Sequence, residues 1–159
     1  MEDNFSEFLK IIEEMEKEGV SYFIIGGFAL VLHGIPRFTE DIDIVIKNDE
    51  DNINKLRKVL FRIYNDDELK EITFAEIEKY PVIRYGSPTG VYIDIMTKLG
   101  GKVLFDELEF REFEIEGKRI KIATLKSLYE TKKNSLREKD KMDVTYILER
   151  MKGEEDAGI

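Results

Sequence analysis

The sequence has no cysteine and only one histidine among its 159 residues. Disulfides, thiolate metal sites and thiol catalysis are therefore excluded, as is a metal site built from several histidines. No apolar run approaches the ~20 residues that a membrane-spanning helix needs. The first residues, MEDNFSEF, are acidic where a secretory signal would be basic and then apolar. We therefore expect a soluble, cytoplasmic protein that has no membrane partner.

Positive charge is in deficit, because 25 Lys and Arg residues face 34 Asp and Glu residues and leave a net charge of −9. An acidic protein repels phosphates on average, which disfavours a protein that coats nucleic acid. Residues 124–142 depart from this balance, because six basic residues there outnumber three acidic ones. By itself, such a segment is most simply a solvated helix face. The basic residues are Lys126, Lys132, Lys133, Arg137, Lys139 and Lys141.

Hydrophobic residues make up 42% of the chain, which is typical of a globular protein. Their spacing predicts an α+β fold with α/β-like features, a mixed β-sheet flanked by helices. We expect one domain over residues 1–159, with a core at about 20–123 and C-terminal helices at about 124–151. The predicted helices cover residues 5–19, 28–33, 51–63, 124–135 and 138–151, with a frayed tail from 153. The predicted strands cover 21–25, 41–46, 81–85 and 91–96, followed by a hairpin over 110–123.

Asp41 and Asp43 are two residues apart on a predicted strand, so both carboxylates point to the same face. With Cα atoms about 7 Å apart, they leave room for two divalent ions. Oxygen ligands favour Mg²⁺ or Mn²⁺. Asp94 lies in the apolar strand VYIDIM, where it would serve as a third metal ligand or as the base for an incoming hydroxyl. A D-x-D pair alone is also found on solvent-facing edge strands, but the three acids together favour a metal site.

Gly26 and Gly27 follow a predicted strand and open a predicted helix. Residues without Cβ atoms allow backbone amides to approach a phosphate, although a tight turn also needs such residues. Only 13 residues separate Gly27 from Asp41. That length returns the chain to an adjacent strand, so the glycine turn and the acidic strand should lie side by side.

The segment IIGGFALVLHGIPRFTEDIDIVI resembles the signature of the DNA polymerase beta-like nucleotidyltransferase superfamily. More narrowly, its order of Gly-Gly, His-Gly and Arg-x-Thr-x-Asp-x-Asp is similar to the AbiEii-like nucleotidyltransferases, whose best-known members are toxins of toxin–antitoxin pairs. The late segment LKSLYETKKNSLREKDKMDVTYIL matches the basic and acidic stretch of that family. The resemblance implies the nucleotidyltransferase fold and Mg²⁺-dependent transfer of a nucleoside monophosphate from a nucleoside triphosphate.

The resemblance also implies roles for individual residues. The metal ligands would be Asp41, Asp43 and Asp94. Gly26 and Gly27 would hold the triphosphate, and Arg37 and Thr39 would line the loop over its phosphates. Among the late residues, Lys132 would neutralise the phosphates, with Lys133 as an equally good neighbour, and Lys139 and Asp140 would complete the site, Asp140 close to the acceptor.

The acceptor does not follow from these residues, and RNA (tRNA included), a protein and a small molecule stay open. A toxin would have RNA or a cognate antitoxin protein as its partner. Lincosamide-modifying nucleotidyltransferases carry a similar Gly-Gly to D-x-D block, so an antibiotic is a further candidate acceptor. Two other hypotheses are a nucleotide-binding regulatory module without catalysis and an interaction protein within a toxin pair. His33, the single histidine, more simply ends a helix and bonds a backbone carbonyl than acts in catalysis.

Overall fold

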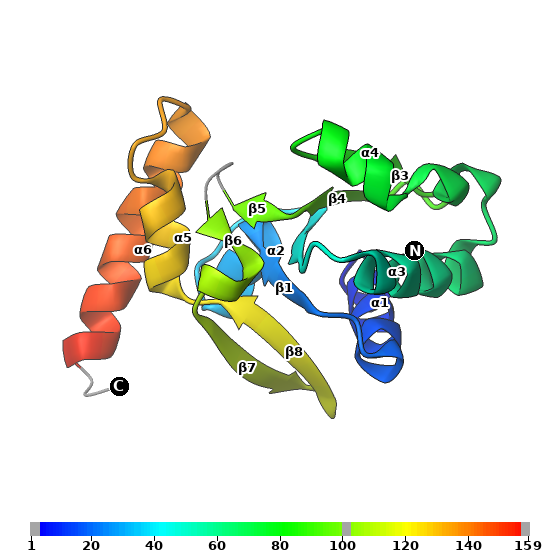
Figure 1. The fold of residues 1–159 in the computed structure, drawn as a ribbon. Coiled ribbons are helices and arrows are strands. Elements are labelled where there is room, and N and C mark those ends of the chain that lie inside the picture. Colours follow the sequence, from blue (N-terminus) through cyan, green and yellow to red (C-terminus); the bar gives the residue numbers. More distant parts are fainter. Residues whose placement is uncertain (1–3, 100–102, 157–159) are drawn as a thin grey trace.

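The structure is a computed structural model that describes residues 4–99 and 103–156 (Figure 1). Its centre is a six-stranded mixed sheet with the strand order β3-β4-β2-β1-β8-β7. A two-residue ladder pairs β5 (Lys98–Leu99) with β6 (Val103–Leu104). The α+β class with a helix-flanked mixed sheet is therefore confirmed. The six strands are β1 (Tyr22–Ile25), β2 (Ile42–Ile46), β3 (Ile83–Gly86), β4 (Tyr92–Met96), β7 (Phe110–Ile115) and β8 (Lys118–Ala123).

The pairing of the central strands decides where the acidic residues lie. Strand β1 pairs antiparallel with β2, and Ile25 is the register partner of Asp43. Strand β2 pairs parallel with β4, and Asp43 is the register partner of Asp94. The turn after β1 and both acidic strands consequently meet at one place on the sheet, as the short connection from Gly27 to Asp41 predicts.

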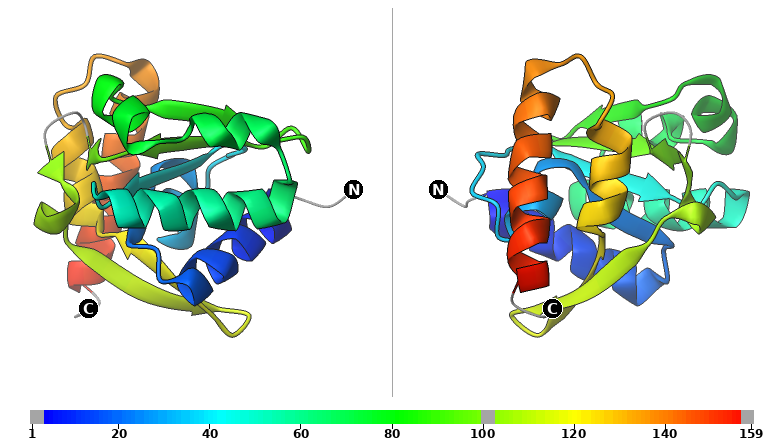
Figure 2. Two further views of the ribbon diagram at one scale, coloured as in Figure 1. Left: turned by 45° about the vertical axis from the view of Figure 1, so that its right-hand side comes forward. Right: turned by 90° about the vertical axis from the view of Figure 1, so that its left-hand side faces the viewer.

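Two groups of helices lie on opposite sides of the molecule, with α1 and α3 together on one side and α5 and α6 on the other (Figures 1 and 2). The short helix α2 opens directly after β1 and contacts both β1 and β2. The helices are α1 (Asn4–Glu18), α2 (Gly26–Leu32), α3 (Glu50–Tyr64), α4 (Phe74–Lys79), α5 (Leu125–Lys132) and α6 (Glu138–Asp156), with 3₁₀ turns η1 (Asp67–Glu71) and η2 (Phe105–Glu107).

The helix starts follow from local capping. The Asp49 carboxylate accepts a hydrogen bond from the backbone N–H of Asn52 at 2.7 Å, which caps α3. Thr124 likewise caps α5 through the backbone N–H of Ser127. Asp and Thr are both favoured at the N-cap position, so both caps agree with the sequence. Inside, the rings of Phe8 and Phe28 stack at 4.3 Å and join α1 to α2 across the core.

The spacing of Val144, Ile147, Leu148 and Met151 predicts that these residues face inward on the last helix. The helix differs from the prediction in length and in its buried face. It continues to Asp156 instead of ending near Met151, so residues 153–156 are helical and not frayed; residues 157–159 lie outside the described part. Leu148, expected to face inward, is 46% exposed, whereas Asp143 is 3% exposed. Asp143 can be buried because it has charged partners, which are described below. Helix α4, both 3₁₀ turns and the β5–β6 ladder were not predicted, and α5 ends at Lys132 instead of near residue 135.

In the described part of the chain, none of the helices combines the length and the apolar character needed to cross a bilayer.

Candidate active site

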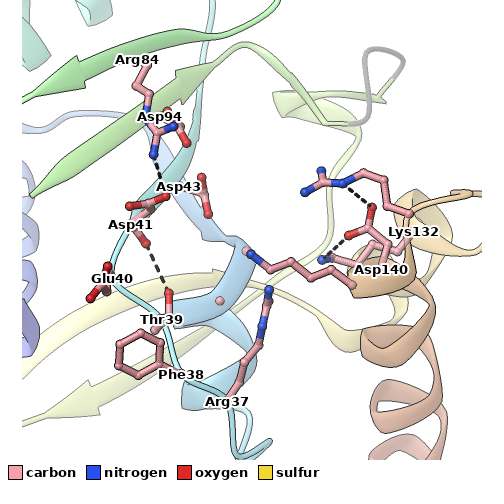
Figure 3. Close-up of a pocket in the computed structure, with 14 residues that line it drawn as sticks. Arg37, Phe38, Thr39, Glu40, Asp41, Asp43, Arg84, Asp94, Lys132 and Asp140 are labelled. Atoms are coloured by element: carbon pink, nitrogen blue, oxygen red, sulfur yellow. Dashed lines mark hydrogen bonds and ion pairs between the residues drawn. The ribbon is translucent and has the colours of Figure 1, made fainter.

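Three carboxylates gather in one cleft of about 420 Å³ beside the central strands (Figure 3). Asp41 directly precedes β2, Asp43 lies within it, and Asp94 lies at the matching position of β4. The strand pairing holds the backbones of Asp43 and Asp94 at neighbouring positions. Among the described residues, however, no three acidic or histidine side chains already converge as a set of metal ligands. The cluster is therefore assembled by the backbone, but its side chains do not form a finished metal cage.

An arginine that was not predicted lies among these acids. Arg84 on β3 places Nη2 2.7 Å from Asp41 Oδ2 and Nε 3.5 Å from Asp94 Oδ1. Figure 3 shows its guanidinium reaching down between the two carboxylates. The sequence held a signal for this contact, because the short turn SPTG sets the register of β3 against β4. That register makes Arg84 the partner of Asp94.

The pKa of Asp43 is set by its burial and by the carboxylates next to it. Burial and the neighbouring carboxylate of Asp94 raise the pKa of Asp43 from 3.8 to about 7, with a further contribution from Asp41. Like charges on one face favour the protonated form of one of them, unless a cation is bound. Asp43 is therefore the residue of this cluster whose charge responds most directly to a bound cation.

The two glycines are required by the packing of the cleft itself. Gly26 has a φ of +69°, and a Cβ there would lie 2.1 Å from Asp43 Oδ2. A Cβ at Gly27 would lie 2.4 Å from the Thr39 hydroxyl oxygen. The sequence suggests that missing Cβ atoms make room for a phosphate. The structure adds that they first make room for the side chains of Asp43 and Thr39, both of which line the cleft.

A cationic wall faces the acids from the C-terminal helices. Lys132 at the end of α5 places Nζ 3.2 Å from Asp140 Oδ1 and 2.7 Å from Asp143 Oδ2. Arg37 Nη1 lies 3.1 Å from the same Asp143 oxygen. Figure 3 shows Lys132 and Asp140 across the cleft from Asp41, Asp43 and Asp94. The C-terminal helices and the loop between them thus bring late basic residues to the cleft.

Of the two neighbours Lys132 and Lys133, Lys132 lines the cleft. The side chain of Lys132 is 15% exposed, whereas Lys133 pairs with Glu130 on the surface. Lys139 and Arg137 also line the cleft. Burial opposes ionisation of Asp140, but the Ser135 hydroxyl and Lys132 outweigh it and lower the pKa of Asp140. Asp140 therefore stays anionic and fixes the ammonium of Lys132.

His33 lies away from this chemistry. It ends α2, is 3% exposed, and places Nε2 2.8 Å from the carbonyl oxygen of Ala123, as expected of a structural histidine. Burial lowers the pKa of His33, so the ring is neutral at pH 7 and donates from Nε2.

Comparison with known proteins decides the family. Residues 16–157 match the family described as "Nucleotidyl transferase AbiEii toxin, Type IV TA system". The chain belongs to the AbiEii nucleotidyltransferase family. It is therefore a nucleotidyltransferase, in agreement with the resemblance read from its motifs. None of the curated proteins matches the sequence.

Solved structures show the same fold at low sequence identity. One is the lincosamide antibiotic adenylyltransferase LnuA bound to lincomycin, with 18% identity and a TM-score of 0.55, covering 89% of this chain and 94% of that one. Another is an antigenic nucleotidyltransferase-like protein from Paracoccidioides brasiliensis, with 19% identity and a TM-score of 0.56, covering 91% of this chain and 76% of that one. At such identities the likeness extends to the fold alone.

Within this AbiEii-family protein, the cleft gathers every residue predicted for the site. These are Gly26, Gly27, Arg37, Thr39, Asp41, Asp43, Asp94, Lys132, Lys139 and Asp140. Two further residues contribute to the site although the sequence motifs predict no role for them. One is Arg84, and the other is Asp143, whose carboxylate joins Lys132 to Arg37. Asp143 lies one helical turn before the buried Ile147, and this position indicates that its side chain also faces inward.

Proposed function

We propose that this chain transfers a nucleoside monophosphate from a nucleoside triphosphate to an acceptor hydroxyl, with Mg²⁺ or Mn²⁺ as cofactor. The observation that carries the proposal is the polarised cleft. Carboxylates of β2 and β4 form one side, and cations from α5, α6 and the loop before β2 form the other. Metal ions and triphosphate need these two surfaces next to each other.

The acidic side fits a hard divalent cation. Asp41, Asp43 and Asp94 offer only carboxylate oxygens, which suit Mg²⁺ and Mn²⁺. Burial and the neighbouring carboxylates of Asp94 and Asp41 raise the pKa of Asp43, and a bound cation would offset the repulsion between these groups. Bound metal supplies charge neutralisation at the attacking and leaving oxygens of the phosphoryl group.

The cationic side fits the triphosphate. Lys132 would meet the phosphate oxygens from a position fixed by Asp140 and Asp143. Arg37, Thr39 and Lys139 line the same cleft, and Gly26 and Gly27 border it without side chains. In the reaction, the acceptor hydroxyl gives up its proton, for which Asp94 is the candidate base, and its oxygen forms a bond to the α-phosphorus. The bond from that phosphorus to the bridging oxygen breaks, and pyrophosphate leaves. Preorganised cations lower the barrier by stabilising the charge on that leaving group.

For the acceptor and the biological role, the family supports a toxin of a type IV toxin–antitoxin pair. RNA or a protein is then the acceptor, and a cognate antitoxin is the partner. A second candidate acceptor is a small molecule, favoured by the fold shared with LnuA, whose structure holds lincomycin.

Label transfer tests the proposal. Each α-³²P-labelled NTP is incubated with Mg²⁺, the protein, and cell RNA, cell protein or lincomycin. Label in RNA or protein supports the toxin role, and label in lincomycin supports the small-molecule role. Asp43→Asn should abolish labelling, whereas Asp67→Asn should not, because the Asp67 side chain is 87% exposed on the surface. A catalytically silent module would show an NTP-dependent thermal shift and label nothing. No label in any arm would overturn the enzyme assignment.

A further inference from the structure

Arg84 holds the acidic side of the cleft in a way that the nucleotidyl transfer chemistry does not explain. Its guanidinium contacts Asp41 and Asp94 at the same time, at 2.7 Å and 3.5 Å. The side chains of these two acids are 43% and 19% exposed, so they also face the cleft. The oxygens that Arg84 contacts therefore belong to the carboxylates that a metal ion would need.

The position of Arg84 is built into the sheet. Antiparallel pairing places it opposite Asp94 and places Gly86 opposite Tyr92. The guanidinium lies 4.3 Å from the centre of the Tyr92 ring, a cation–π contact. At Gly86 a Cβ would lie 3.0 Å from Tyr92 Cε1, so the glycine makes room for the ring. The Arg84 side chain is 52% exposed, and the backbone register together with the contact to the Tyr92 ring aims its guanidinium at the acids.

The same contacts bear on how a metal ion would bind these acids. In the described residues the acids do not converge on one point, and Arg84 lies between two of them. We propose that Arg84 is an internal counter-cation that competes with the divalent metal for Asp41 and Asp94. Metal must displace the guanidinium, which weakens metal binding to the protein alone. The displaced guanidinium is then free to meet an anionic ligand in the same cleft. This inference rests on the proposed metal-dependent function.

The test is Mn²⁺ binding to the whole chain without nucleotide, measured by the loss of the free-ion signal in electron paramagnetic resonance. Arg84→Met removes one positive charge and two contacts with the acids. The Kd for Mn²⁺ should fall by roughly tenfold, because a unit charge several ångström from a dication repels it by about that factor even in a water-like dielectric. Arg119→Met is the matched control, because Arg119 carries the same charge but pairs with Glu112 on the surface. That control should bind Mn²⁺ as the wild type does.

The outcomes separate this inference from the proposed function. Tighter Mn²⁺ binding by Arg84→Met, with Arg119→Met unchanged, supports the competition. If the wild type binds Mn²⁺ and Arg84→Met binds it equally or more weakly, the competition is overturned while the metal-dependent function stands. If neither protein binds Mn²⁺, the metal-dependent function fails and the inference fails with it. Arg84→Gln keeps a polar side chain in the strand and must give the same direction of change, which covers the case in which Arg84→Met does not fold.

Discussion

Replacing Asp43 with asparagine should stabilise the protein without metal and abolish its response to metal. Asparagine keeps the shape of the side chain beside Gly26 but removes the negative charge. The pKa of Asp43 is raised in the folded state, to about 7 from 3.8. Its contribution to stability is therefore complete below about pH 3.8 and is lost as the pH rises to about 7. Above that range, the ionised group destabilises the folded state.

The size of the effect follows from the same pKa. One pKa unit corresponds to about 1.4 kcal/mol, so the ionised group lowers the free energy of unfolding by up to ~4 kcal/mol above pH 7. Asparagine still places a polar side chain in this largely buried position, which reduces the expected gain to about 2 kcal/mol. For a chain of this length, that gain raises the melting temperature by roughly 4–8 °C. At pH 4 the two proteins should melt at nearly the same temperature.

The assay is thermal unfolding in EDTA and in excess Mg²⁺, at pH 4, 6 and 8. Mg²⁺ should raise the melting temperature of the wild type at pH 8, because a ligand that binds only the folded state stabilises it. It should leave Asp43→Asn unchanged. Asp67→Asn, on the exposed 3₁₀ turn, controls for the loss of a carboxylate in general. The reasoning is refuted if Asp43→Asn in EDTA at pH 8 is no more stable than the wild type.

Three further outcomes are expected. Gly27→Ala should lower labelling at least tenfold, because its Cβ would lie 2.4 Å from the Thr39 hydroxyl oxygen. Gly153→Ala is the contrasting variant, because a Cβ there would lie in open space on α6. It should raise the free energy of unfolding, measured in urea, by about 0.5–1 kcal/mol. Asp143→Asn should lower the free energy of unfolding by about 3 kcal/mol, because it leaves the buried ammonium of Lys132 with one partner fewer; an unchanged urea midpoint would contradict this. Chelation of divalent metal should reduce labelling by at least about 100-fold, with recovery on added Mg²⁺ or Mn²⁺.

The acidic cluster could be predicted from the sequence because local rules decide it. Two-residue alternation places Asp41 and Asp43 on one face, and the short connection after Gly27 returns β2 beside β1. Asp94 was found because a lone acid interrupts an apolar strand. Each of these signals is contained within a few residues, which is the range over which a sequence pattern reports structure reliably.

The residues that were missed depend on contacts between distant segments. Arg84 meets Asp41 across 43 residues of sequence, and β3 alone gives no reason to point it at a cleft. Asp143 lies at a position of α6 where an apolar residue is expected, because Lys132 and Arg37 provide partners from two other elements. Helix α6 also extends beyond Gly153, where Glu154 pairs with Arg111 and Arg150. Asp143 and the end of α6 thus depend on ion pairs with other elements, and Arg84 depends on how its hairpin lies beside Asp41.

These missed contacts share a physical role. The three carboxylates on adjacent strands repel one another. Basic residues line the same cleft and would pair with these carboxylates if they had no other partner. Arg84 restrains the acids on one side, while Asp140 and Asp143 restrain Lys132 on the other. Asp41, Asp94 and Lys132 are therefore each held by an opposite charge of the protein. Metal and triphosphate arriving together would exchange both sets of partners, since the metal takes the carboxylates and the phosphates take the cations. Binding of the two ligands should consequently be cooperative, with each one lowering the Kd of the other by the same factor.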